Sequence, residues 1–252
     1  MTLTISTSWL TGFLLALARA SAWTVITPPF RTTAVPVRVR IALAVALAFV
    51  VAPDLAPATE DPIDTGALLV SVVAQVLVGL ALGFVVMLLL SAVQAAGNII
   101  DVLAGFGLAS IYDPMSGAAS SPFGRLYELL ATVLLFAVDG HIVLVRGFLR
   151  SFEAIPATSL DLGAFAELLT DGLTGMFIVA VQIALPIAAA LFVADIALGL
   201  LGRAAPRINV LILGLGAKTL VALLLVGLAL PLLPSAVRTL TSRAMSITGL
   251  GG

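Results

Sequence analysis

The sequence predicts an all-α integral membrane protein built from long broken helices and helical hairpins. Of its 252 residues, 61% are hydrophobic and 10% are charged, whereas a soluble domain carries about 25% charged residues. A soluble core of this size cannot hide so much apolar surface, so lipid or similar subunits must replace water around most of the chain. The apolar runs are continuous rather than alternating, which favours helices over a membrane barrel.

The first half of the chain contains three apolar blocks. The block from Trp9 to about Thr27 is predicted to be a retained first membrane helix, because no basic residue precedes it as in a signal peptide. Residues 41–52 are too few to cross a bilayer, which takes about 20 residues. Residues 65–100 carry no formal charge, and this length predicts a helix that is tilted, broken or extended beyond the membrane.

The second half begins with a block from Leu126 to about Leu149 that polar residues interrupt. Residues 172–194 are again uncharged, and a turn at residues 202–209 leads into a final apolar run. This pattern predicts a helical hairpin near the end of the chain, because both arms are long enough to span a membrane.

The hairpin contains several polar positions that we single out as candidates. Lys218 is the one basic residue deep in the final apolar run, and it is predicted either to pair with Asp195 across the hairpin or to extend toward a polar boundary. The arginines near the turn indicate a cytoplasmic location for it. The candidate hairpin-turn residues are Arg203, Pro206, Arg207, Asn209 and Lys218.

Small residues predict where one helix approaches another. Gln75, Gly79 and Gly83 follow one another at spacings of four, so they share one helical face. A Gly-x-x-x-Gly pair permits close backbone approach, and a glutamine beside it can hydrogen-bond across the contact. We therefore expect a helix-packing site here.

A polar stripe follows on the same apolar block. Gln94, Asn98 and Asp101 fall on one helical face, and three polar groups facing lipid would be costly. The stripe is predicted to lie near a channel or a subunit contact. The alternative for Asp101 alone is a local role in capping a helix or a turn.

Residues 101–122, DVLAGFGLASIYDPMSGAASSP, interrupt the apolar pattern with glycine, serine and proline. Asp113-Pro114 and Ser116-Gly117 are strong turn signals. Irregular backbone at membrane depth is tolerated only where protein buries it or a cavity borders it. Since bulky apolar residues alternate with small ones, the segment suits a flexible seal across a passage rather than a loop in water.

The residues give no support for an enzyme. The chain has no cysteine and a single histidine, His141, so thiolate chemistry and a two-histidine zinc site are excluded. No serine lies in a Gly-x-Ser-x-Gly motif. We expect no catalytic residue, no metal site and no cofactor. The net charge of −1 also gives no basic patch for nucleic acid.

Motifs in a consistent order along nearly the whole chain resemble the FliR family of flagellar export-gate proteins, whose injectisome counterpart is SctT. Each motif is weak alone, but their order and spacing together are fairly specific. The motifs are Pro36 with Arg38 and Arg40, Gly97-x-x-Ile100-Asp101, Gly105-Phe106, Asp113-Pro114, Gly140-His141, Ser151-Phe152-x-x-x-Pro156, Pro206-x-x-Asn209-Val210 and Gly214-x-x-x-Lys218.

The resemblance implies a fold, partners and a site. It implies one export-gate domain over residues 1–252, with a FliP-like part at 1–171 and a FliQ-like hairpin plus C-terminal tail at 172–252. It implies assembly with FliP and FliQ subunits and association with FlhB. It also implies that the central segment, residues 105–122 and here called the plug segment, helps close the channel. The plug or seal residues carried over are Gly105, Phe106, Gly107, Ile111, Tyr112, Asp113, Pro114 and Met115.

The function implied is that of a membrane subunit of the flagellar type III protein export gate. Such a subunit would help form and seal a channel for unfolded flagellar proteins, in the bacterial inner membrane and the flagellar basal body. Two alternatives remain open. One is the injectisome subunit of the same family, and the other is a secondary transporter for a small solute, in which broken helices and midplane polar residues also occur.

Overall fold

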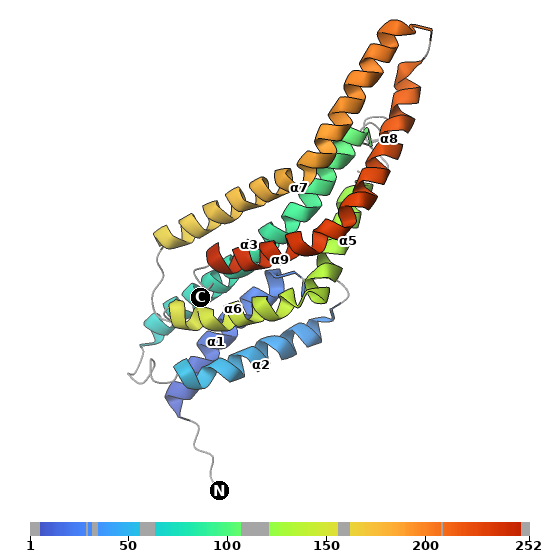
Figure 1. Cartoon of the computed structure of the whole chain (residues 1–252). Helices are drawn as coiled ribbons and strands as arrows, with labels where there is room; N and C mark the ends of the chain where they lie inside the picture. Colours follow the sequence, from blue (N-terminus) through green and yellow to red (C-terminus); the bar gives the residue numbers. More distant parts are fainter. Residues whose placement is uncertain are drawn as a thin grey trace. The chain divides into compact units, whose positions relative to one another are not determined.

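A computed structural model describes residues 6–28, 30–31, 35–55, 64–106, 121–155, 162–207 and 209–247. Within these ranges every regular element is a helix (Figure 1). The prediction of an all-α fold is therefore confirmed. Residues 107–120 of the plug segment lie outside the described residues.

The helices correspond to the long apolar blocks of the sequence, and residues with turn signals separate them. In chain order they are α1 Thr7–Ile26, α2 Val37–Leu55, α3 Thr65–Ala104, α5 Pro122–Ala137, α6 Gly140–Ala154, α7 Leu162–Ala204, α8 Val210–Ala229, the 3₁₀ turn Leu230–Leu232 and α9 Leu233–Ile247.

Four of the described helical stretches are long and apolar enough to cross a membrane. They are Thr7–Ile26, Thr65–Ala104, Phe165–Ala204 and Leu213–Ser246, and the total becomes five if α5 and α6 form one broken span. Helix α2 is not among them although it runs through 19 residues, because Arg38, Arg40 and Asp54 fall within it. The apolar block of residues 41–52 is thus part of a longer helix than the apolar run alone. These lengths and compositions indicate a multi-pass membrane protein.

Helices α3 and α7 are longer than a bilayer requires. Helix α3 runs through 40 residues, which corresponds to about 60 Å at 1.5 Å per residue. Of the three alternatives for this block, a broken helix is excluded, because α3 is continuous. Helix α7 is also continuous over 43 residues although it contains Pro186, which removes one backbone hydrogen bond that a membrane helix tolerates.

The chain divides into two compact units. One comprises Met1–Leu88, Asp139–Thr174 and Leu240–Gly252, and the other comprises Leu89–Val138 and Gly175–Thr239. The predicted boundary between residues 171 and 172 falls inside α7, so it is not a boundary between elements. The division into FliP-like and FliQ-like parts stays a prediction.

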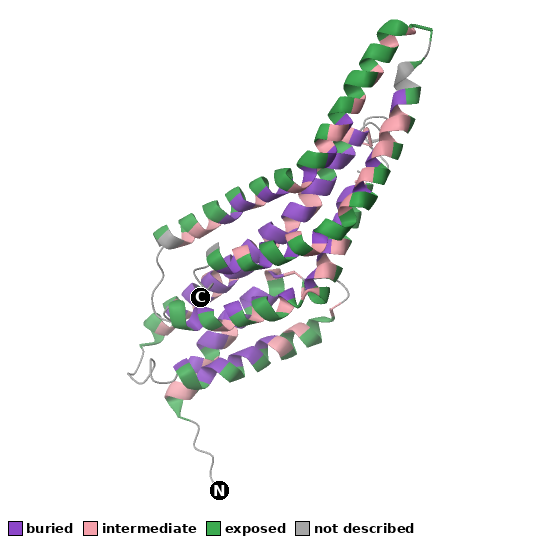
Figure 2. Ribbon diagram, in the orientation of Figure 1, coloured by how far each residue is buried: buried purple, intermediate pink, exposed green. Residues whose placement is uncertain are grey.

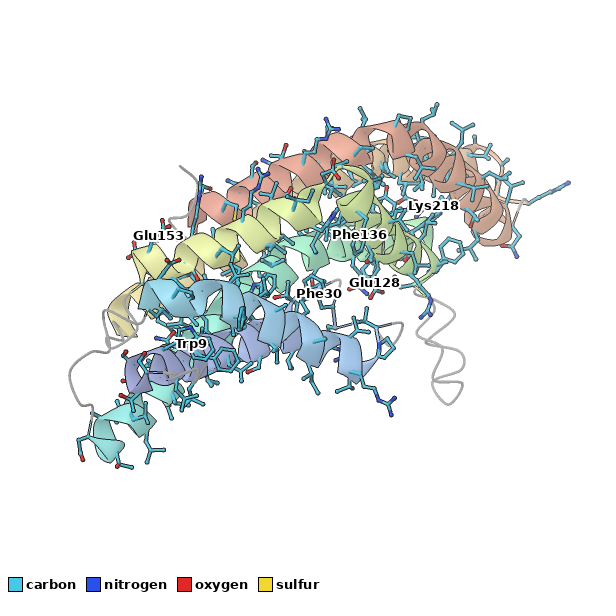
Figure 3. All side chains as sticks on the ribbon, turned by 90° about the horizontal axis from the view of Figure 1, so that it is seen from below. Trp9, Phe30, Glu128, Phe136, Glu153 and Lys218 are labelled. Atoms are coloured by element: carbon cyan, nitrogen blue, oxygen red, sulfur yellow. The ribbon has the colours of Figure 1, made fainter. Side chains whose placement is uncertain are left out.

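The first unit has an apolar core around α1. Helix α2 packs along α1, and Trp9, labelled in Figure 3, stacks on Phe13 and meets the ring of Phe49 edge-on. Deeper in the unit, Trp23 stacks on Phe148 of α6 with ring centroids 4.6 Å apart. Aromatic pairs of this kind add to the area that the core buries.

The second unit exposes much of its apolar surface. The outward faces of α7 and α8 are largely exposed in Figure 2 and carry large apolar side chains. Only 22% of the spanning window in Leu213–Ser246 is buried, against 67% of the window in α3. A surface of this composition requires lipid or other protein around it. On α7, α8 and the 3₁₀ turn after α8, the most exposed large apolar residues are Phe177, Leu185, Phe192, Val193, Leu200, Leu220, Leu223, Leu224, Leu228 and Leu232.

Candidate functional site: the base of the plug segment

The structure describes the first two predicted seal residues, Gly105 and Phe106, and the base on which the segment stands. The other predicted seal residues, Gly107, Ile111, Tyr112, Asp113, Pro114 and Met115, lie outside the described residues.

Helix α3 ends at Ala104, and Gly105 follows it in a C-terminal cap. Gly105 has φ 94°, a left-handed conformation that only glycine adopts without strain. The Phe106 N–H donates to Asp101 O at 3.0 Å, and the Gly105 N–H donates to Val102 O at 3.2 Å. These two bonds form a Schellman motif, so the chain leaves α3 at a defined place and direction.

The Asp101 side chain starts the next helix. Its carboxylate accepts hydrogen bonds from the backbone N–H groups of Phe123 at 3.2 Å and Gly124 at 2.9 Å. Ser121 precedes α5 but makes no capping hydrogen bond itself, and its hydroxyl donates to Asp101. Asp101 thus has the capping role that the sequence leaves open, and its negative charge suits the N-terminus of α5.

The backbones of α3 and α5 meet beside this cap. A methyl group added at Gly97 would lie 2.6 Å from Phe123 O and 2.7 Å from Gly124 Cα. The rings of Phe106 and Phe123 pack edge to face with centroids 5.7 Å apart. Two glycines therefore permit the contact, and the residues that precede and follow the plug segment are joined at its base.

The other members of the polar stripe also have partners within the chain. Gln94 Nε2 donates to Glu128 Oε2 at 3.2 Å; Glu128, labelled in Figure 3, lies on α5. Asn98 Oδ1 lies in contact with the Ser121 hydroxyl. The stripe thus faces α5 and the start of that helix. Its location near a channel or a subunit contact stays a prediction.

The predicted helix-packing site lies where α1 and α3 meet. A methyl group added at Gly79 would collide with the Arg19 carbonyl oxygen, and one added at Gly83 would lie 2.5 Å from Ile26 Cγ2. Gln75 is buried and accepts a hydrogen bond from Arg19 Nε at 2.6 Å. The three residues thus combine close backbone approach with a polar contact between the helices.

Arg19 is the functional candidate that sequence reasoning misses. It is fully buried, and its guanidinium reaches α3 and the end of α6. The one signal that the sequence offers is a single arginine within an otherwise uncharged apolar block, since an ionisable residue in a membrane helix is costly and seldom incidental.

In the hairpin, Arg203, Pro206, Arg207 and Asn209 lie at the connection between α7 and α8, with both arginines exposed. Lys218 lies farther on, in α8, and its Nζ is 2.7 Å from Asp195 Oδ1. The first of its two predicted roles, an ion pair across the hairpin, is therefore observed.

The described residues contain no group of three or more side chains able to hold a metal ion. What the site does provide is an anchor for the two ends of the plug segment. A glycine-terminated helix, a capped helix start and a glycine-lined helix crossing fix the two points between which the plug segment runs.

Fold and site together define a helical, multi-pass membrane protein in which the end of α3 is hydrogen-bonded to the start of α5. A family model described as bacterial export proteins, family 1, matches residues 10–244. The chain belongs to this family, and the resemblance inferred from its motifs is confirmed.

Curated relatives agree along most of the chain. The chain is 34% identical over 218 residues to the flagellar biosynthetic protein FliR of Bacillus subtilis (strain 168), with 85% of this chain and 84% of that protein covered. It is 32% identical over 227 residues to FliR of Escherichia coli (strain K12), covering 90% and 87%. It is 28% identical over 193 residues to Yop proteins translocation protein T of Yersinia pestis, covering 75% and 74%.

Proposed function

We propose that this chain is a core membrane subunit of the flagellar type III protein export gate. In this role it helps form and seal the channel through which unfolded flagellar proteins cross the inner membrane at the basal body. Its work is geometric rather than catalytic. The greater identity to relatives with flagellar names than to the translocation protein supports the flagellar system.

The proposed partners are FliP and FliQ subunits in a hetero-oligomeric gate, with FlhB associated. The exposed apolar faces of α7 and α8 support this assignment, because a single chain in water would not retain them. Membrane lipid would cover whatever surface the partners leave open.

The observation that carries the sealing role is the base of the plug segment. Asp101, in the last turn of α3, accepts hydrogen bonds from the first N–H groups of α5, so the residues on either side of the plug segment are held together. A segment fixed at both ends can be displaced by a passing substrate without separating the helices that hold it. Its bulky residues Phe106, Ile111, Tyr112 and Met115 would form the seal.

Replacement of residues 106–115 by glycine and serine tests the sealing role. We expect the assembled gate to form in normal amount and the membrane to become leaky to ions, because the small polar residues cannot close the passage. Conductance across a planar bilayer or dissipation of an ion gradient in cells measures the leak.

The matched control places serine at Ala204 and Ala205 in the hairpin connection, where an altered turn should leave conductance unchanged. Intact assembly with unchanged conductance in the 106–115 variant would reject the sealing role.

Deletion of the gene distinguishes the flagellar system from the injectisome. Loss of flagellar filaments supports the flagellar assignment, whereas normal filaments with loss of injectisome secretion would overturn it in favour of the Yersinia-like function.

A further inference from the structure

Arg19 is a cation held inside a helix that is otherwise apolar. Its side chain is 0% exposed, and a buried charge without compensation costs several kcal/mol. Burial on this scale requires acceptors for the guanidinium. The identity of those acceptors therefore tells what the residue does.

Every acceptor that Arg19 has in the described part of the chain is uncharged. Nη1 donates to Ser151 O at 2.7 Å and to Ser151 Oγ at 3.2 Å, Nη2 donates to Ile155 O at 3.0 Å, and Nε donates to Gln75 Oε1 at 2.6 Å. The ion pair between Lys218 and Asp195 does not involve Arg19.

The two backbone oxygens belong to the C-terminal end of α6. Helix α6 ends at Ala154 and Ile155 is its C-cap residue. The last carbonyls of a helix have no partner within the helix, and together they carry about half a negative charge. The end of α6 therefore supplies partial negative charge and open hydrogen-bond acceptors to the guanidinium.

The aromatic neighbour completes the site. The Arg19 guanidinium carbon lies 4.2 Å from the centroid of the Phe152 ring, within the range of a cation–π contact. A proline follows Ile155 in the sequence, and the residue before a proline disfavours helical backbone. This accounts for the Ser151-Phe152-x-x-x-Pro156 motif, in which the serine and the phenylalanine bind the guanidinium and the proline ends the helix where a carbonyl is needed.

We propose that the end of α6 is an internal guanidinium-binding site, formed by Ser151, Phe152 and Ile155 and occupied by Arg19. The carbonyl end of α6, rather than an acidic residue, compensates the charge. Through Gln75 the same guanidinium reaches α3, so one side chain locks α6 to α1 and α3. This site is independent of the export function, and its test does not depend on export.

The full-length chain, purified in detergent, provides the test. Trp9→Phe leaves Trp23, which stacks on Phe148 of α6, as the reporter of α6 packing. In that background Arg19→Met should lower the thermal midpoint by on the order of 10 °C and shift Trp23 emission to the red. Arg19→Gln should behave similarly, whereas Arg19→Lys should lose less, because it keeps the charge but not the planar fork.

Three variants make the result specific. Arg146→Met removes an exposed arginine from α6 and should change neither the thermal midpoint nor the Trp23 emission. Asp161→Asn removes the first acidic residue after Ile155 in the sequence. It should also be neutral, because the proposal assigns no acidic partner to Arg19. Phe152→Leu should destabilise the chain much less when Arg19 is already Met, with a coupling of about fivefold or more in the unfolding equilibrium.

The proposal fails if Arg19→Met or Arg19→Gln keeps the parent's midpoint and emission, since a space-filling role would then suffice. It also fails if Asp161→Asn is as damaging as Arg19→Met, or if the effects at Arg19 and Phe152 simply add. If Arg19→Met does not accumulate, the same cycle with Arg19→Lys and Phe152→Leu decides the question.

Discussion

A single residue, Asp101, takes part in the C-terminal cap of α3 and in the N-terminal cap of α5. Its carbonyl oxygen accepts the Phe106 N–H that closes the cap of α3, and its carboxylate accepts two N–H groups at the start of α5. Asp101 is buried, so water cannot replace these bonds. An aspartate suits the position because it offers two acceptor oxygens on a short side chain and the charge that a helix N-terminus favours.

Asp101→Ala should destabilise the chain by about 2 kcal/mol, the upper range for loss of an N-terminal cap. The free N–H groups of α5 would then be buried without partners. Thermal unfolding of the purified chain, followed by circular dichroism, measures the change. Asp101→Asn is the control and should lose less, because it keeps one acceptor oxygen. An unchanged midpoint in Asp101→Ala would contradict the assignment.

At the scale of elements, the crossing of α1 and α3 depends on two glycines one turn apart. Gly79 faces the Arg19 carbonyl oxygen, and Gly83 faces Ile26 and Thr27. Without side chains at these positions the two backbones approach closely, and dispersion contacts along the crossing replace a hydrophobic force that is weak between helices in lipid. The same approach brings Gln75 within reach of Arg19.

Gly79→Ala should destabilise the chain by about 1–3 kcal/mol, the usual cost of overpacking. Alanine favours helix by about 1 kcal/mol over glycine, but the loss should still appear. The new methyl group would collide with the backbone carbonyl oxygen of Arg19, which cannot move aside as a side chain can. Gly227→Ala in α8 is the matched control. Its added methyl would meet no atom within 4 Å apart from the backbone of its own helix and its chain neighbours, so it should be neutral or stabilising. Equal midpoints for the two variants, measured by thermal unfolding, would show that the crossing is loose.

At the scale of the whole molecule, the described helices leave more apolar surface than the chain covers by itself. In the spanning window of α3, 67% of the residues are buried, whereas only 28% and 22% are buried in the windows of α7 and of Leu213–Ser246. The difference indicates that α3 has its neighbours within the chain, while α7 and α8 require lipid or other subunits. The Lys218–Asp195 pair reduces the cost of placing charge on such a hairpin.

Co-expression with FliP- and FliQ-like proteins from the same genome should yield a complex that survives size-exclusion chromatography in mild detergent. The physical reason is that partner helices would cover the apolar faces of α7 and α8. An unrelated multi-pass protein of similar size is the control and should not co-elute. Elution of the chain alone, together with solute uptake by the reconstituted chain, would instead support a transporter.

Local information in the sequence was sufficient for the fold class and for several contacts. Continuous apolar blocks set the helices, and spacings of four placed Gln75, Gly79 and Gly83 on one face. The cap role of Asp101 could be foreseen only as an alternative. Its partners Phe123 and Gly124 lie 22 and 23 residues farther along the chain, beyond a stretch whose sequence has no regular apolar pattern.

The sequence by itself determined that this is a helical membrane protein, since composition and the lengths of the apolar runs do not depend on how the helices are arranged, and its ordered motifs placed it in the bacterial export family. Only the tertiary structure decided which groups satisfy its buried polar atoms. Arg19 binds residues 56, 132 and 136 positions away, and no local pattern encodes such pairs. The partner of a buried charge is set by how the helices pack, because that packing alone brings the end of α6 to the middle of α1.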